Sequence, residues 1–421
     1  MIGFLKNRKK TAAKKNPHYS LMYSRRYGFS QTLTFAAELV PAAFLYLHSK
    51  AFYTGYYKKR MKFSYLLFPF AILYGTGMRL RNFFYDSGIF SIFSFEYPVI
   101  GVGNLTVGGT GKTPHIEYLI RYLMPNFKVA TLSRGYGRKS KGFLIVKPGM
   151  SVARAGDEPL QFKTKFPEIK VVVGEKRVPA MMSLLATYPD IEVVLLDDAY
   201  QHRSIKPGLS ILLTEYKHLF TRDYLLPAGT LREPRRALRR AHIVIVTKTP
   251  AEATDDSFKR IRAELKIPSS KSLFFTTMKY NALVPVNGVI ADMSPSNLRN
   301  QHVLAFSGLA RPSGFVSFLK NNARSVTHIR YPDHYNYTPK DISKLREKFN
   351  EIESDDKIII TTEKDWMRIR NEPFRDLFDG LPAYTIGVQV EFVDRREKVL
   401  FESKITNYVE KNQPNRLFYR K

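Results

Sequence analysis

From residue 97 onward, short apolar runs alternate with segments of helical periodicity, and no other feature of the sequence limits the fold as strongly. Helical patterns lie at His115–Met124 and Arg177–Tyr188. Apolar runs of four or five residues are typical of strands buried on both faces. The predicted strands are Val99–Val102, Val129–Leu132, Val171–Val173, Val193–Leu196, Leu209–Leu213 and Ile243–Val246. The alternation predicts a mostly parallel α/β sheet with helices on both faces.

A second α/β stretch follows a polar transition, containing Pro and Asn, near residues 250–300. Its predicted strands are Val303–Phe306 and Ile358–Thr361, with a helix at about Lys340–Asn350. We therefore expect a core domain over residues 97–250. Residues 251–421 are expected to form a smaller C-terminal α/β domain that contributes to a cleft.

A glycine-rich loop lies between the strand at Val99–Val102 and a helix that begins near Thr113. Glycines let backbone N–H groups surround phosphate oxygens, Lys112 adds a positive charge, and the Thr113 hydroxyl can bind Mg²⁺. The strict phosphate-loop pattern has glycine at the position of Thr106, but the strand–loop–helix context is kept. This context predicts a P-loop NTPase-type fold. The predicted ATP-binding residues are Thr106, Val107, Gly108, Gly109, Thr110, Gly111, Lys112 and Thr113.

Two carboxylates, Asp197 and Asp198, directly follow the apolar strand Val193–Leu196, and Gln201 lies close behind them. Carboxylates at the carboxyl end of a strand beside a phosphate loop can hold Mg²⁺ or its bound waters. The alternative is a pair of aspartates in a surface turn.

Asp157 and His334 are candidates for acid–base chemistry. Asp157 precedes a short helix, so it either caps that helix or acts as a general base. His334 follows Asp333 in a predicted loop, where it is either structural or orients and tunes a catalytic carboxylate.

Four arginines follow Pro234 as two pairs, Arg235/Arg239 and Arg236/Arg240. On an α-helix each pair would have i,i+4 spacing, and like charges at that spacing repel. An anion such as phosphate or acidic lipid would relieve the repulsion. The alternative is a solvated helix face.

The net charge of +30 favours anionic partners, which include nucleic acid, acidic lipid and phosphorylated substrates. No cysteine is present, which excludes disulfides and thiolate metal sites. No helix-turn-helix, zinc or RNA-binding signature supports a nucleic-acid partner. A GTPase or metallochaperone is a further alternative, but Thr247-Lys248-Thr249-Pro250 lacks the aspartate that reads guanine.

Residues 1–61 form a basic extension that precedes a second apolar run, Phe63–Gly77. This run is short for a membrane crossing, which needs about 20 apolar residues. Basic flanks and tyrosines suit a helix that lies in one leaflet, so residues 62–96 are predicted to be a membrane-associated segment. The alternative is a core helix.

Taken together, these motifs resemble the tetraacyldisaccharide 4′-kinase family, the lipid A 4′-kinases of Gram-negative bacteria. The resemblance runs from about residue 62 to beyond residue 390, and the family's phosphate loop also lacks the first glycine. Ala199 and Tyr200 depart from the family's usual Gly-Phe. The motifs that carry the resemblance, in order, are Leu80–Asp86, Val102–Pro114, Ser133–Gly137, Gly156–Pro159, Asp197–His202, Leu226–Pro234, Tyr331–His334 and Thr362–Asp365.

The resemblance implies transfer of the ATP γ-phosphate to the 4′-hydroxyl of a tetraacyl glucosamine disaccharide 1-phosphate. It also implies Mg²⁺ and association with the cytoplasmic face of the bacterial inner membrane. No nucleic acid and no obligate protein partner are expected. The implied residues are Asp157, His334 and Lys112 for catalysis; Thr113, Asp197, Gln201 and Glu233 around the metal; and Arg134, Tyr136, Asp198 and Arg232 for substrate or phosphate.

The family's chains start close to the apolar run, and Met61 stands just before it. We therefore hypothesise that Met61 is the true start and that residues 1–60 are untranslated. The intact mass of the native protein would test this hypothesis.

Overall fold

The computed structural model describes residues 60–286, 294–370, 374 and 376–413, and the predictions for residues 1–59 lie outside this range. The described residues fall into two compact units. One contains residues 60–92 and 225–229, and the other contains residues 93–224 and 230–413. Each is described separately below.

The smaller unit is dominated by a single long helix, α3 (Arg60–Asp86), which continues through Pro69. It extends beyond the predicted apolar run at its carboxyl end and includes the motif Leu80–Asp86. Several of its large apolar side chains are exposed: Leu66, Phe70, Ile72, Leu73, Leu80 and Phe83. None of the helices in the described part of the chain has the length and apolar character needed to cross a membrane.

The larger unit is built on a twelve-stranded sheet with the order β10-β9-β11-β12-β8-β7-β6-β1-β5-β2-β4-β3. All six predicted strands of the first half are present and parallel to one another, and the α/β fold is confirmed. The short strand β3 (Leu144–Ile145) pairs antiparallel at the edge. The predicted strands correspond to β1 (Val99–Asn104), β2 (Val129–Ser133), β4 (Lys170–Val173), β5 (Val193–Asp197), β6 (Leu209–Glu215) and β7 (Ile243–Thr247).

Helices cover both faces of this first half. Isoleucine and leucine side chains of α4 (Lys112–Leu123) pack with those of β1, β5 and β6 in one core cluster. Apolar residues of α7 (Arg177–Thr187) belong to a different cluster. The remaining helical segments of this half are α5 (Val152–Ala155), α6 (Asp157–Lys165), η3 (Phe220–Arg222), η4 (Arg235–Arg240) and α8 (Asp255–Leu265).

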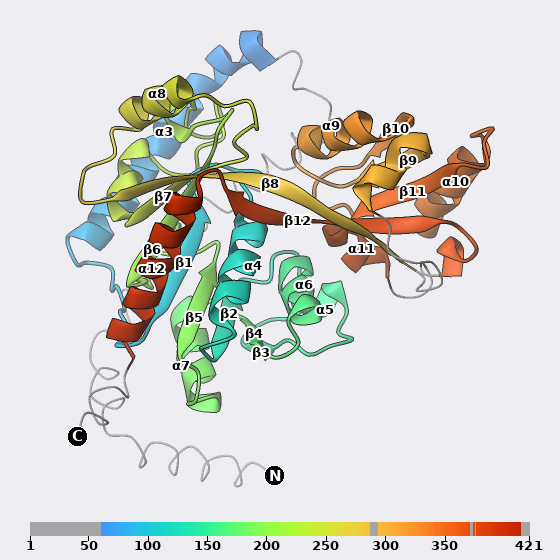
Figure 1. The fold of residues 1–421 in the computed structure, drawn as a ribbon. Coiled ribbons are helices and arrows are strands. Elements are labelled where there is room, and N and C mark those ends of the chain that lie inside the picture. Colours follow the sequence, from blue (N-terminus) through green and yellow to red (C-terminus); the bar gives the residue numbers. More distant parts are fainter. Residues whose placement is uncertain (1–59, 287–293, 371–373, 375, 414–421) are drawn as a thin grey trace. The chain divides into compact units, whose positions relative to one another are not determined.

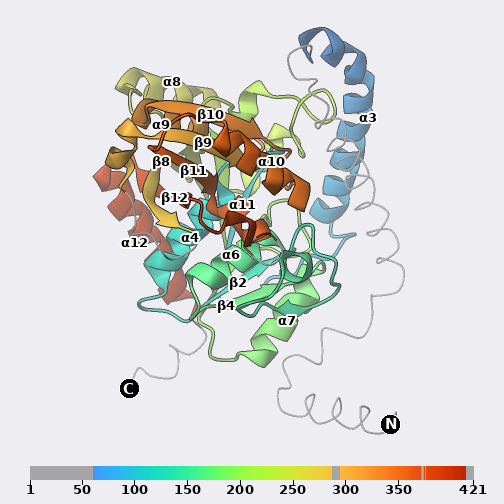
Figure 2. The ribbon, with the colours of Figure 1, turned by 90° about the vertical axis from the view of Figure 1, so that its right-hand side faces the viewer.

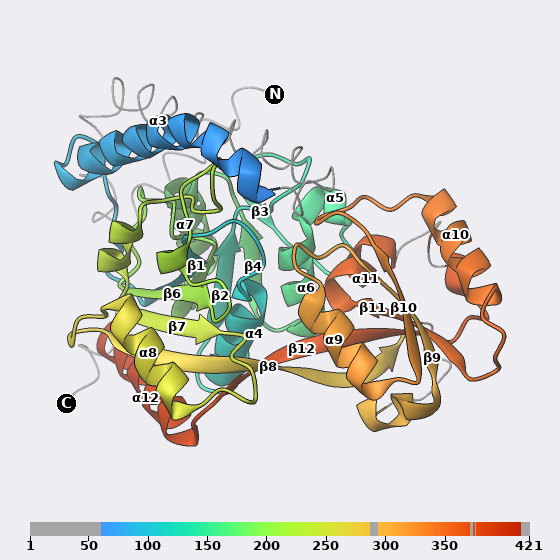
Figure 3. The same ribbon diagram turned by 90° about the horizontal axis from the view of Figure 1, so that it is seen from above.

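Residues 250–300 were expected to be a polar transition, and this expectation was wrong. They contain α8 and the long strand β8 (Ser272–Pro285). β8 begins with buried apolar residues beside β7 and then pairs antiparallel with β12 (Ala383–Phe392). The polar residues of its second part lie in this ribbon, which Figure 1 and Figure 3 show leading from one half of the sheet to the other. Several of those residues are only partly buried, which explains why the sequence there is not uniformly apolar.

The second half of the sheet contains β9 (His302–Ser307), β10 (Ser325–Arg330) and β11 (Lys357–Thr362). The strands predicted from the apolar runs correspond to β9 and β11. Its helices are α9 (Ser313–Asn322), α10 (Pro339–Asn350) and α11 (Glu363–Ile369), with short turns η5 (Pro295–Asn300) and η6 (Asp376–Phe378). The last helix, α12 (Arg395–Lys411), returns to the first half, where Phe401, Ile405 and Val409 join its core. The domain boundary predicted at residue 250 stays a prediction.

Candidate active site

The glycine-rich loop connects β1 to α4 and leaves the first turn of α4 without a side-chain cap. Gly108 and Gly111 have φ angles of 110° and 89°, which glycine adopts without the strain a side chain would bring. The N–H groups at the start of α4 have no capping side chain to satisfy them, and such groups form an anion site. The loop therefore has the phosphate-binding geometry that its sequence predicts.

Lys112 and Arg232 converge on Asp198 beside this loop. Lys112 Nζ lies 3.4 Å from Asp198 Oδ1, and the Arg232 guanidinium donates to both Asp198 oxygens at 2.9 and 3.1 Å. Both cations also bond to Asn104 at the end of β1. Burial would raise the pKa of Asp198, but Arg232 and Lys112 hold that pKa well below its usual range. Asp198 therefore holds two phosphate-directed cations at the mouth of the loop.

The segment that carries Arg232 and Glu233 runs along the phosphate loop. Val107 N–H donates to Thr230 O, and Arg232 N–H donates to Leu105 O, both at 2.7 Å. Glu233 is fully buried, and its Oε2 accepts from Arg240 at 2.7 Å. The structure thus places the predicted phosphate contact and one predicted metal neighbour beside the loop.

The pairing predicted for the four arginines that follow Pro234 was wrong. They form the 3-10 helix η4, in which residues three apart, and not four apart, lie above one another. Arg235 donates to Asp223 O, and Arg240 donates to Tyr200 O and Glu233. These two side chains are therefore engaged by the protein and do not form a joint anion site.

Asp197 is a buried carboxylate at the end of β5, only 2% exposed, with no hydrogen-bond partner for Oδ1 among the described residues. Burial, with Glu158 and Asp198 nearby, raises its pKa to about 8. Arg177 is buried behind it and donates to the Asp197 carbonyl at 3.5 Å. An unsatisfied buried carboxylate oxygen at a strand end suits a cation.

The metal neighbourhood was tested against Mg²⁺, which binds through one or two carboxylates plus substrate phosphates. The described residues contain no group of three or more acidic or histidine side chains arranged to hold a metal on their own. Thr113 Oγ1 donates to Glu158 Oε1 at 3.1 Å, and Gln201 donates its amide to Asn104 O at 2.9 Å. Together with the open Asp197 oxygen, this donor set fits Mg²⁺ held jointly with a nucleotide.

Asp157, the first residue of α6, contacts His334 and two cations. Its Oδ2 lies 3.0 Å from His334 Nδ1 and 4.0 Å from Lys364 Nζ, and it also accepts from the Arg368 guanidinium. Burial would raise the pKa of Asp157, but Lys364, the His334 hydrogen bond and Arg368 hold it well below its usual range. The result is a buried carboxylate, 2% exposed, that stays ionised.

The backbone around this carboxylate is held by glycine. Gly156 has φ 90° and ψ 155°, a conformation that is essentially restricted to glycine. Asp157 Oδ1 accepts from the N–H of Glu158 at 3.0 Å, but Gly156 is the cap residue of α6 and no side chain caps this helix, so the alternative that Asp157 is a helix cap was wrong. Its other oxygen carries the contacts to His334 and Arg368. Helix capping therefore does not explain the position of this side chain.

Lys364 and Arg368 come from α11, which packs against α6 (Figure 2). Thr362 caps α11 by accepting from Asp365 N–H at 3.1 Å, and Asp365 in turn accepts from Arg368 at 3.2 Å. Sequence reasoning did not assign Glu158, Lys364, Arg368, Asn104 or Arg177 to the site. The motif Thr362–Asp365 was the only signal that pointed toward α11.

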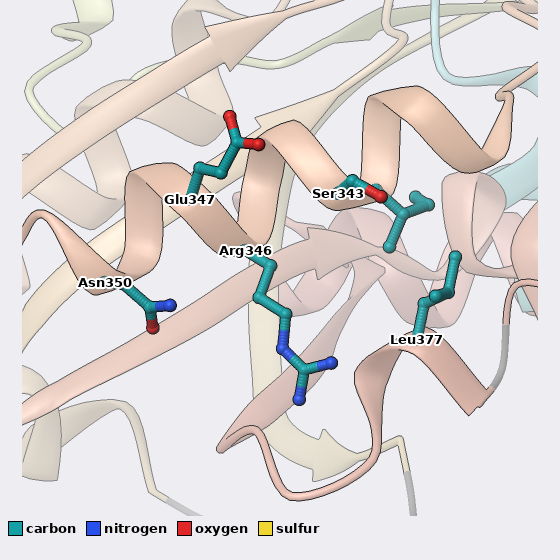
Figure 4. A pocket seen from close by; sticks show the side chains of 6 residues that line it. Ser343, Arg346, Glu347, Asn350 and Leu377 are labelled. Carbon is teal, nitrogen blue, oxygen red and sulfur yellow. The ribbon is translucent and has the colours of Figure 1, made fainter.

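Arg134 and Tyr136, predicted substrate contacts, are exposed at the end of β2. The Tyr136 ring lies 5.0 Å from the His334 ring, centre to centre. This places an open aromatic surface beside the Asp157–His334 pair. By contrast, the pocket in Figure 4 lies on α10 and contains none of the predicted site residues; its lining is Ile342, Ser343, Arg346, Glu347, Asn350 and Leu377.

A phosphate loop, a strand-end carboxylate and an ionised carboxylate beside a histidine define a phosphoryl-transfer enzyme of the P-loop class. The family model for tetraacyldisaccharide-1-P 4′-kinase matches residues 63–407, and the chain belongs to this family. The predicted resemblance is thereby confirmed.

Individual relatives agree with this assignment. The chain is 41% identical over 361 residues to the tetraacyldisaccharide 4′-kinase of Phocaeicola vulgatus, covering 85% of this chain and 98% of that protein. It is 41% identical over 348 residues to that of Flavobacterium johnsoniae, covering 82% and 97%. The crystal structure of LpxK from Aquifex aeolicus in complex with ATP aligns with a TM-score of 0.63 at 31% identity, covering 82% of this chain and 99% of that one.

Proposed function

We propose that this protein is the lipid A biosynthesis kinase that transfers the γ-phosphate of ATP to the 4′-hydroxyl of an acylated glucosamine disaccharide 1-phosphate. Membership of the 4′-kinase family supports the reaction class. The observation that carries the proposal for the residues is the link between Thr113 and Glu158 at 3.1 Å. It joins the start of the phosphate-loop helix to the residue beside Asp157, so donor and acceptor sites adjoin.

In the proposed reaction the sugar oxygen attacks the γ-phosphorus, and an O–P bond forms while the bond to the ADP oxygen breaks. The hydroxyl proton passes to Asp157. A carboxylate of low pKa accepts that proton late, after O–P bond formation has made the hydroxyl acidic. His334 orients the carboxylate, while Lys112 and Arg232 offset charge on the transferring phosphate and the leaving ADP.

Thr113, Asp197, Gln201 and Glu233 are the residues proposed to hold Mg²⁺ together with the nucleotide. When bound, Mg²⁺ supplies positive charge at the phosphate oxygens. Arg134 and Tyr136 are proposed to contact the disaccharide phosphate and ring, since both are exposed after β2 and Tyr136 lies beside His334.

The substrate's acyl chains place the reaction at a membrane surface, because each CH₂ exposed to water costs about 0.8 kcal/mol. The exposed apolar side chains of α3, including Phe70, Leu73 and Phe83, suit burial at the interface. Arg79 of the same helix is exposed and suits acidic head groups. We therefore propose association with the cytoplasmic face of the bacterial inner membrane.

The test is incubation with ATP, Mg²⁺ and the acylated disaccharide 1-phosphate, with mass spectrometry of the lipid. We expect a bisphosphorylated product, and Asp157→Ala or Lys112→Ala should abolish turnover while the far-UV circular dichroism stays unchanged. Lys128→Ala, which removes an exposed surface lysine, serves as the control. Near-normal turnover in either site variant would remove that residue from the mechanism, and absence of lipid product with the wild type would refute the function.

A further inference from the structure

Arg311 approaches the phosphate loop from the second half of the sheet. It lies in the connection between β9 and α9. A Cβ built on Gly108 would lie 3.9 Å from Arg311 Nε and 4.0 Å from Nη2, so the guanidinium faces the loop across this glycine. Gly108 has no side chain to separate the guanidinium from the loop backbone. The Arg311 side chain is 22% exposed, which places it at the rim of the loop.

Glu215 holds the guanidinium in this orientation. It ends β6, is 8% exposed, and accepts from Arg311 Nη1 through Oε2. Its other oxygen lies 3.3 Å from Lys248 Nζ. One carboxylate thus pairs with two cations, and the group keeps a net positive charge beside the loop.

No described residue accepts a hydrogen bond from the two Arg311 nitrogens that face Gly108. Nε and Nη2 have no hydrogen-bond partner in the described part of the chain, since the bond to Glu215 uses Nη1. A guanidinium stays charged at all relevant pH values, and its forked N–H groups match phosphate oxygens. The side chain is therefore anchored at one nitrogen and presents two others toward the phosphate loop.

We propose that Arg311 is a nucleotide-binding residue that contacts the terminal phosphates of ATP, with Glu215 as its positioning residue. Lys112 reaches the phosphates from the start of α4, whereas Arg311 reaches them from the Gly108 side of the loop. Arginines supplied from outside the loop stabilise transferring phosphoryl groups in other P-loop enzymes. The inference rests on the proposed kinase function but concerns a residue outside the loop, α4 and the base.

The competing interpretation is that Arg311 only stabilises the fold through its pair with Glu215. The two interpretations differ in what the ligand must contain. If Arg311 contacts the terminal phosphates, replacing it weakens the binding of ATP and leaves the binding of AMP almost unchanged. If its pair with Glu215 is merely structural, replacing Arg311 lowers the stability of the fold and weakens the binding of both ligands equally.

The experiment is calorimetric titration of Arg311→Gln, Arg311→Lys, Glu215→Gln and the control Arg324→Gln with Mg-ATP and with AMP. Arg324 is exposed in the same half of the sheet. We expect Arg311→Gln to weaken ATP binding at least about tenfold, as for a hydrogen bond to a charged group. AMP affinity should change less than about twofold. Arg311→Lys, which keeps the charge and loses the fork, should fall between wild type and Arg311→Gln.

Glu215→Gln should weaken ATP binding less than Arg311→Gln, because the Arg311 guanidinium is still present and is only held less firmly in its orientation. The inference is overturned if Arg311→Gln binds ATP as tightly as Arg324→Gln, or if ATP and AMP lose affinity equally. If Arg311→Gln fails to fold, the Arg311→Lys titration decides by the same comparison. Turnover on the lipid is measured separately: a wild type that binds ATP without phosphorylating the disaccharide refutes the proposed function and leaves the Arg311 result standing.

Discussion

Replacing Arg368 by methionine tests whether α11 controls the ionised state of Asp157. Arg368 is almost fully buried, with its side chain 5% exposed, and it pairs with Asp157 and Asp365. Methionine has a similar length and removes only the charge and the donors. Asp157 would keep Lys364 at 4.0 Å and His334 at 3.0 Å.

Removing one partner of a buried ion pair costs about 3–5 kcal/mol, because it leaves the other charge without compensation. Because Asp157 keeps its contacts with Lys364 and His334, we expect the cost of Arg368→Met to lie at the lower end of this range. The free energy of unfolding at pH 7 should therefore fall by about 3 kcal/mol. The pKa of Asp157 should rise by at least about one unit, which corresponds to about 1.4 kcal/mol.

The pH dependence follows from the sign of this shift. In the wild type the folded-state pKa of Asp157 lies below its unfolded value of about 3.9, so ionised Asp157 stabilises the fold above that pH. This contribution is lost as the pH falls through the folded-state pKa. The stability difference between wild type and Arg368→Met should therefore be largest near pH 7 and shrink below about pH 4.

Two assays measure these effects: urea unfolding between pH 3 and 7, and the pH profile of kcat/KM with the lipid substrate. The acidic limb of kcat/KM should move to higher pH in Arg368→Met and stay in place in Arg370→Met. Arg370 ends the same helix but bonds to the Thr164 hydroxyl at 3.0 Å and so is a matched control. An unshifted acidic limb in Arg368→Met, despite a folded protein, would refute the view that Arg368 holds Asp157 ionised.

Three further changes probe the surrounding scaffold. Burial lowers the pKa of His115 to about 4, so the unfolded chain binds a proton on this imidazole before the folded chain does as the pH falls, and the free energy of unfolding should fall by about 3 kcal/mol between pH 6.5 and 4. His115→Gln should make the free energy of unfolding less dependent on pH in this range, as measured by urea unfolding. An unchanged pH dependence would contradict the assignment to His115. Glu117→Gln should change the free energy of unfolding at pH 7 by less than about 1 kcal/mol, because burial raises the pKa of Glu117 and Lys165, its partner at 2.8 Å, keeps a second pair with Glu363; a loss of about 3 kcal/mol or more in urea unfolding would count against this view. Gly156→Ala should reduce kcat about tenfold or more with ATP affinity unchanged, because a Cβ would lie 3.0 Å from Gly135 Cα at φ 90° and displace Asp157; wild-type kcat would show that the site tolerates the strain.

The first half of the fold could be predicted because its strands are buried on both faces and are therefore almost purely apolar. Val193–Leu196 is one such run, and the structure extends it by one residue to Asp197. β8 escaped prediction because its second part pairs only with β12 and carries polar residues such as Lys279 and Asn281. Periodicity reports burial, so it fails where a strand leaves the core.

The same physical limit applies to the site. Lys112, Thr113 and Asp197 were predictable because local chain direction places them at the carboxyl ends of neighbouring parallel strands. The bond between Arg368 and Asp157 joins residues 211 positions apart, and no local pattern encodes such a contact. In the sequence, Arg368 is one of many basic residues, and no local motif marks it.

Residues contributed by the second half act by setting the charge of groups that the first half carries. Lys364 and Arg368 hold Asp157 ionised, and Glu215 of β6 orients Arg311 from the β9–α9 connection against Gly108. In this arrangement the phosphate loop and the proposed base both depend on cationic side chains that the second half contributes. A kinase built this way can place a buried carboxylate near ATP phosphates, since the α11 cations offset repulsion between two negative groups. The second half is therefore part of the chemistry, through cations that act on the proposed base and at the phosphate loop.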